Sequence, residues 1–149
     1  MIKNILNLGD TAVYCDFGVE VNETINASVI VYFHHISELI KDKKIEGITN
    51  LTPSYNKLII SFDLTITNYK KIKNFVEGLN IGKNIKNNNQ KVKIPVCCDD
   101  EYGLDFSRLI EKLNIDKNKI LELYFSKEYF CYMTGFIAGM PFLGDLNEN

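Results

Sequence analysis

The sequence has almost no net charge, and this argues against several kinds of partner. Its 17 basic and 19 acidic residues leave a formal net charge of −2. Proteins that bind nucleic acids or membrane surfaces typically gather a strongly basic patch. We therefore expect neither nucleic acid nor membrane as a partner. The hydrophobic content of 46% and the charged content of 24% are ordinary for a soluble globular chain.

Long hydrophobic runs are also lacking. The first residues, Met-Ile-Lys-Asn-Ile, do not contain the apolar stretch of a signal peptide. The uncharged run from Tyr129 to Gly144 is shorter than the ~20 residues of a membrane-spanning helix and is interrupted by Pro141. We expect a cytoplasmic protein whose thiols are reduced.

Motifs for metals, phosphates and nucleophiles are incomplete. His34 and His35 are adjacent, whereas a helical metal pair needs a spacing of four. The segment 78–84 is one residue short of a phosphate-binding loop and ends in Asn instead of Ser or Thr. The acidic cluster 99–101 has no third ligand at a suitable spacing. No metal site is expected, although Glu101 and Asp105 stay open as acid–base candidates.

The four cysteines form no C-x-x-C pair, and no histidine is placed in the sequence to activate Cys97 or Cys98 as a nucleophile. Cys131 falls within an apolar stretch and is expected in the core.

Hydrophobic periodicity in the first 80 residues predicts two strands, a helix, two strands and a second helix. A Gly9-Asp10 dipeptide is typical of a two-residue hairpin turn between the first two strands. The predicted strands cover 2–8, 12–17, 45–51 and 57–64, and the predicted helices cover 23–41 and 69–79. This order indicates an α+β domain, a ferredoxin-like α/β sandwich of antiparallel sheet and two helices.

A glycine- and asparagine-rich segment, 81–91, is the predicted linker between this domain, 1–80, and a second one, 92–149. The second domain is expected to begin with a strand over 92–96, in which Pro95 suggests an edge or strand-end position. Helices follow over 105–113 and 116–124, with Asp105 and Asp116 as their N-caps, and then an apolar strand over 129–134. Strand edges and apolar faces would be left uncovered in so short a domain, so we expect the C-terminal third to be less stable than the N-terminal domain, or to need a partner.

The segment 135–144 is the most informative part of the chain. It holds three glycines, one proline and two phenylalanines: Gly135, Gly139, Gly144, Pro141, Phe136 and Phe142. We expect a shaped loop without regular structure, pinned to the core by Phe136 and Phe142. Alternatively, the glycine N–H groups could cradle an anion such as phosphate or carboxylate. Just before it, Glu128 and Tyr129 could shape a polar pocket or be a surface carboxylate and a packed ring.

The segment also resembles a known family signature. Gly135-Phe136-x-x-Gly139-x-Pro141-Phe142-Leu143-Gly144 is similar to the GFxPGFxYLG pattern of the 5-oxoprolinase B-subunit family. Ile94-Pro95-Val96-Cys97, with Glu101-x-Gly103-x-Asp105-Phe106, resembles its IPVxYGGxxGPDL block. Ser126 to Tyr129 and Gly9 to Val13 are similar to two further blocks, in the family's order. The family also includes allophanate hydrolase subunit 1 and a histidine-kinase inhibitor.

The resemblance implies a cyclophilin-like β-barrel domain after the N-terminal domain, and a function. Such a chain is a subunit of an ATP-dependent enzyme that opens 5-oxoproline to glutamate, and it acts only in a complex with other oxoprolinase-like subunits. ATP would be used by the complex, and the isolated chain should be inactive. Glu128, Tyr129 and the 135–144 loop become candidates for binding or subunit contact, with the catalytic residues unknown.

The sequence departs from the pattern at several positions. Ala138 replaces the usual proline, Met140 a phenylalanine, and Asp99-Asp100 a glycine pair. The sequence ends at Asn149, before the family's T-P-R and PAGSVGI-like segments, so only the opening of the barrel is expected. Two alternatives therefore stay open: a non-catalytic regulator that binds a histidine kinase, and a degenerate or split fragment.

Overall fold

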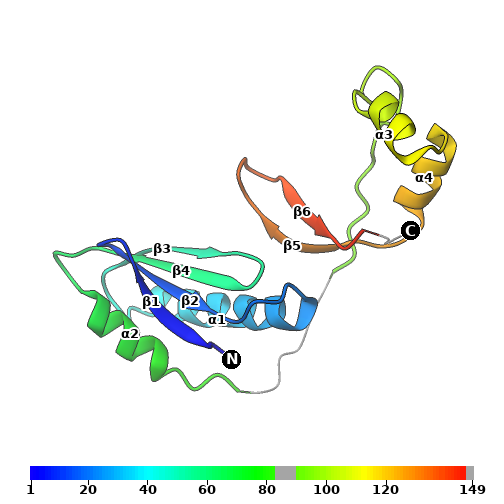
Figure 1. Cartoon of the computed structure of the whole chain (residues 1–149). Coiled ribbons are helices and arrows are strands. Elements are labelled where there is room, and N and C mark those ends of the chain that lie inside the picture. Colours follow the sequence, from blue (N-terminus) through cyan, green and yellow to red (C-terminus); the bar gives the residue numbers. More distant parts are fainter. Residues whose placement is uncertain (83–89, 147–149) are drawn as a thin grey trace. The chain divides into compact units, whose positions relative to one another are not determined.

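The computed structural model describes residues 1–82 and 90–146 (Figure 1). Contacts divide the chain into two compact units. The first contains Met1–Asn87 and Cys131–Leu143, and the second contains Asn88–Phe130 and Gly144–Asn149. The predicted domain boundaries stay a prediction, and residues 83–89 of the predicted linker lie outside the described residues.

An antiparallel four-stranded sheet forms the centre of the first unit. Its spatial order is β1-β2-β4-β3. The strands are β1 (Asn4–Leu8), β2 (Ala12–Asp16), β3 (Ile48–Pro53) and β4 (Lys57–Phe62). The predicted order of elements and the mixed α/β class with an antiparallel sheet are thus confirmed. The first hairpin differs in detail: Leu8 pairs with Ala12, so residues 9–11 form the turn, and Gly9 has φ +59°.

Strand β3 is shifted relative to its prediction. The predicted strand covers 45–51 and stops before Thr52-Pro53-Ser54, residue types that are common in turns. The structure continues it to Pro53, which pairs with Leu58 of β4. Since β3 is at the edge of the sheet, the missing N–H of a proline can face away from the ladder.

Two helices, α1 (Glu23–Lys41) and α2 (Tyr69–Glu77), pack on the sheet and close the core (Figure 1). Asn22 caps α1, because its side-chain oxygen accepts a hydrogen bond of 2.9 Å from the Ile25 N–H. Val29 and Ile36 of α1 are fully buried, as the apolar stripe of the sequence predicts. They join buried side chains of β2, β4 and α2, and Phe17 just after β2, in one core: Val13, Cys15, Phe17, Leu58, Ile60, Phe62, Ile72 and Val76.

The second unit contains helices α3 (Phe106–Leu113) and α4 (Lys117–Phe125), and none of their residues is buried. Asp116 caps α4 as predicted, accepting 2.8 Å from the Lys119 N–H. Asp105 precedes α3 without capping it and instead forms an ion pair with Arg108 at 3.0 Å. The predicted strand over 92–96 is wrong, because in the described part of the chain no strand pairs with this segment.

A two-stranded hairpin completes the described structure, with β5 (Phe130–Thr134) paired to β6 (Pro141–Gly144). Strand β5 agrees with the predicted apolar strand. Strand β6 contradicts the expectation that 135–144 has no regular structure. Pro141 is the first residue of its strand, one of the few strand positions where proline is tolerated. No helix in the part of the chain that the structure describes is long and apolar enough to cross a bilayer.

Candidate functional site

The glycine-rich segment forms a closed loop at the tip of the β5–β6 hairpin. The Gly135 N–H donates to the Met140 carbonyl at 3.1 Å, and the Met140 N–H donates to the Ile137 carbonyl at 3.2 Å. Gly139 has φ +81°, a conformation that favours glycine. We call residues 135–140 the apex loop. Its shape is set by these backbone hydrogen bonds.

The aromatic residues of this segment behave differently from each other. Phe136 is 90% exposed and has φ +66°, so the prediction that it pins the loop to the core is wrong. Phe142 is half-buried and packs edge-on against Tyr55 with ring centroids 6.3 Å apart. Tyr55 also stacks at a tilt against Tyr132, which is buried, at 5.5 Å. The hairpin is therefore held through its two strands, β5 and β6, which we call the stem, whereas the ring of Phe136 lies in solvent.

A buried asparagine fastens the same stem. Asn26, in the first turns of α1, is 2% exposed. Its side-chain nitrogen donates to the carbonyl of Tyr132 on β5 at 2.9 Å, and to those of Tyr55 and Ser54 at 2.9 and 3.2 Å. An amide NH₂ carries only two hydrogens, so three carbonyls share them. One side chain thus connects α1, the β3–β4 turn and β5, and we call this arrangement the Asn26 latch.

A second asparagine organises the neighbouring loop. The side-chain nitrogen of Asn56 donates to the carbonyls of residues 18, 19 and 20 at 3.0, 3.2 and 3.0 Å. Beside it, Lys57 pairs with Asp16 and donates to the Gly18 carbonyl. The hydrogen bond from Lys57, with one from the Gly18 N–H, holds the pKa of Asp16 below its ordinary value. These contacts tie the connection between β2 and α1 to the β3–β4 turn.

Glu128 and Tyr129 belong to the second unit. Glu128 is exposed and forms an ion pair with Lys91 at 2.8 Å. The Tyr129 hydroxyl donates to the Tyr124 carbonyl at 2.8 Å, and Lys127 lies 5.5 Å from the centre of its ring. The two residues are thus a surface carboxylate and a packed ring within their own unit, while the apex loop belongs to the other.

The other candidate residues of the sequence analysis show no arrangement that would form a site in the described part of the chain. Pro141 and Gly144 are the two end residues of β6. The Gly135 N–H, one of the three proposed for an anion cradle, already donates to a carbonyl of its own loop. Cys131 is exposed on β5, contrary to the expected core position. Among residues 1–82 and 90–146 there is no group of three or more His, Cys, Asp or Glu that could hold a metal ion.

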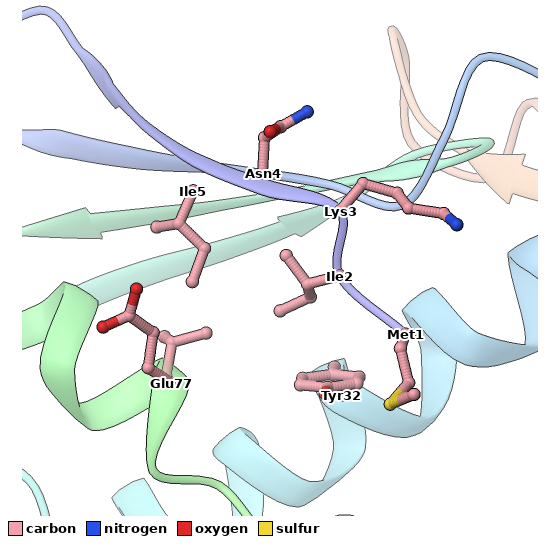
Figure 2. A pocket seen from close by; sticks show the side chains of 8 residues that line it. Met1, Ile2, Lys3, Asn4, Ile5, Tyr32 and Glu77 are labelled. Carbon is pink, nitrogen blue, oxygen red and sulfur yellow. The ribbon is translucent and has the colours of Figure 1, made fainter.

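Two features of the first unit were not predicted from the sequence. Burial raises the pKa of the Cys15 thiol to about 12, so this thiol is unreactive at neutral pH. A cavity of about 270 Å³ lies between β1, α1 and α2, where Ile2, Ile5 and Tyr32 lie close together and Lys3 and Glu77 contribute charge (Figure 2). Burial raises the pKa of the Tyr32 hydroxyl above its ordinary value.

Sequence reasoning also missed both asparagines. A signal for Asn26 was present, because this polar residue lies between Ile25 and Val29 on a helix whose apolar stripe faces the core. A polar side chain in such a position needs hydrogen-bond partners when it is buried. Asn56, in a turn, carried no comparable signal.

Comparison with known proteins gives relatives along the whole chain. The 5-oxoprolinase B-subunit of Bacillus subtilis (strain 168) is 26% identical over 160 residues, covering 97% of this chain and 63% of that protein. The 5-oxoprolinase B-subunit of Haemophilus influenzae is 36% identical over 58 residues, covering 39% of this chain and 27% of its own length. The chain therefore spans less than two thirds of the curated relatives that it matches.

Solved structures support the fold. A crystal structure of TTHA0988 in space group P212121 matches with a TM-score of 0.72 at 22% identity, covering 93% of this chain and 26% of that one. The crystal form in P6522 matches with a TM-score of 0.66. The family model described as carboxyltransferase domain, subdomain C and D, matches residues 3–149. Because this match covers nearly every residue, the chain belongs to the carboxyltransferase domain family, subdomain C and D.

Proposed function

We propose that this chain is a subunit of a cytoplasmic, ATP-dependent 5-oxoprolinase and that it acts only within a hetero-oligomeric complex. The observation that carries the proposal is the alignment of 97% of the chain with a protein named as a 5-oxoprolinase subunit. The word subunit in that name supports partners of the same kind for this chain. The exposed apex loop on its fastened stem offers a surface for such a contact.

The proposed reaction explains why ATP is needed. The lactam of 5-oxoproline is a poor electrophile, and phosphorylation of its oxygen makes ring opening by water feasible. The sequence has no complete phosphate-binding loop that would give this chain an ATP site of its own. Gly78, which begins the near match to a phosphate loop, ends α2 and donates its N–H to the Asn74 carbonyl at 3.0 Å. We therefore assign ATP to the complex as a whole.

We also propose that the first unit is a ferredoxin-like sandwich and that the β5–β6 hairpin is the opening of a cyclophilin-like barrel. The sheet order supports the first part. Strands β2 and β3 are joined through α1 and are separated in the sheet by β4, which is the split β-α-β arrangement. The hairpin supports the second part, since antiparallel barrels are built from such pairs.

The test is reconstitution with defined components. The chain is purified alone and after co-expression with each oxoprolinase subunit of its own organism, and ATP hydrolysis is measured with and without 5-oxoproline. We expect no turnover by the isolated chain and 5-oxoproline-dependent formation of glutamate and ADP by the complex. A complex that is equally active without this chain would refute the proposal. Inhibition of a purified histidine kinase by the isolated chain would support the regulatory alternative instead.

A further inference from the structure

The apex loop exposes apolar side chains in a backbone conformation that costs free energy. Phe136 is 90% exposed and Ile137 is 63% exposed, and Met140 is also exposed. Phe136 has φ +66°, in the left-handed region that a bulky residue rarely adopts. Strained residues of this kind persist where the surrounding structure holds them, and they gather at functional sites. Neither the exposed ring nor its backbone contributes to the core of this chain.

The stem below the apex loop is held firmly in place. The Asn26 latch binds the Tyr132 carbonyl at 2.9 Å, and Phe142 packs against Tyr55. The loop is closed by the hydrogen bond between the Gly135 N–H and the Met140 carbonyl. An exposed aromatic ring on a pre-ordered loop loses little conformational entropy when it binds.

The charges around the apex loop distinguish between three possible binding surfaces: a membrane, a second copy of the chain and a different protein. No charged residue lies between Tyr129 and Gly144, and the charges that flank this run on either side are the acidic Glu128 and Asp145. Loops that enter membranes usually add basic residues that meet anionic lipids. The cavity between β1, α1 and α2 in a second copy of this chain would also bind an apolar loop poorly, because Lys3 and Glu77 line that cavity. An apolar pocket on a different protein fits these features best.

We propose that Phe136 and Ile137 insert into an apolar pocket on another subunit of the oxoprolinase-like complex. The inference rests on the proposed function, because the partner is a subunit of that complex. Aromatic anchors that fill pockets are typical of the residues that dominate binding free energy at interfaces. Removal of the ring should therefore weaken the complex by at least about 30-fold in Kd.

The experiment compares matched variants against each purified subunit by biolayer interferometry. Phe136→Asn removes the ring but keeps a residue type that tolerates positive φ. Ile137→Ser removes the second anchor. Val19→Ser is the control, since Val19 is 95% exposed in the same unit but lies outside the apex loop. None of the three variants should melt below the parent protein, because each altered side chain is largely in solvent.

We expect the parent and Val19→Ser to bind one subunit equally and both apex variants to bind it at least about 30-fold more weakly. Equal binding by all four proteins would overturn the inference and leave the proposed function standing. If the parent binds none of the subunits, both the proposed function and the inference fail. Two further results would overturn the inference. One is binding of the parent to vesicles of phosphatidylcholine and phosphatidylserine that is lost in Phe136→Asn. The other is dimerisation of the parent in the ultracentrifuge that is lost in Phe136→Asn.

Discussion

Replacement of Asn26 by aspartate tests the latch with the smallest change of shape. The substitution exchanges the side-chain NH₂ for oxygen and leaves the volume almost unchanged. In the parent, this nitrogen donates to three carbonyls at 2.9–3.2 Å from a residue that is 2% exposed. In the variant, a carboxylate would face three carbonyl oxygens with no hydrogen to share.

The expected loss of stability follows from the number of donors and from the buried charge. Two N–H donors are lost, each worth roughly 1 kcal/mol net, and the acceptors left behind are buried. An unpaired charge in the interior raises the cost, so we expect the free energy of unfolding at pH 8 to fall by about 3–5 kcal/mol. Such a loss is a large part of the total stability of a small domain, which is about 5–15 kcal/mol.

The loss should depend on pH in a defined direction. Burial beside carbonyl oxygens raises the pKa of the introduced carboxyl above its unfolded value of about 3.9. The folded variant then keeps a proton that the unfolded chain releases, so its stability falls as pH rises from about 4 to the raised pKa. Below that range the neutral carboxyl can donate one hydrogen, and we expect a deficit of only about 1–2 kcal/mol.

Urea unfolding at pH 4 and pH 8, followed by circular dichroism, measures this difference. Hydrogen exchange of β5 and β6 reports whether the hairpin is released first. Asn68→Asp is the matched control, because the exposed side chain of Asn68 caps α2 by accepting the Lys71 N–H at 3.0 Å, which a carboxylate does equally well. We expect the control to stay within about 0.5 kcal/mol of the parent. An Asn26→Asp variant with the parent's stability at pH 8 would refute the reasoning.

Other predictions concern the rest of the described chain. Asn56→Ala should lower the free energy of unfolding by about 1–3 kcal/mol in urea, because three carbonyls lose their donor. Cys15, with a pKa of about 12, should resist a thiol reagent at pH 8 until the protein is denatured, whereas the exposed Cys97 and Cys131 react, as seen by mass spectrometry. Lys57→Met should raise the pKa of Asp16 toward its ordinary value in an NMR titration. In the parent, the stabilisation from this lowered pKa is present above the ordinary carboxyl pKa and is lost as pH falls through the lowered one. Amides of α3 and α4 should exchange faster than those of β2 and β4, since neither helix has a buried residue; equal protection would contradict this.

The regular elements of the first unit could be predicted because their signals are local. Helix α1 was predicted at its observed bounds from its apolar periodicity, and α2 ends two residues before its prediction. Strand β4 alternates between buried and half-buried residues, as its sequence does. These patterns depend on neighbours a few residues away, so the sequence alone carries them.

The hairpin and its contacts could not be predicted in the same way. Strand β6 exists because β5 lies beside it, and the four residues of β6 carry no alternation that would reveal a strand. The exposure of Phe136 was missed because an aromatic residue is more often buried than displayed. The family resemblance pointed to the 135–144 segment, but only the three-dimensional structure separates Phe142 at the stem from Phe136 at the tip.

The two buried asparagines explain how the irregular parts of the first unit are held. Strands satisfy their carbonyls through the ladder, but the carbonyls of residues 18–20 and 54–55 lie in connections between elements. In each case the carbonyl oxygens lie around one side-chain NH₂, which can donate two hydrogens. Serine or threonine would supply one hydrogen, and a lysine ammonium would add a charge that needs a partner in the interior. The positions of Asn26 and Asn56 therefore require a short amide, and the placement of the hairpin depends on the one at Asn26.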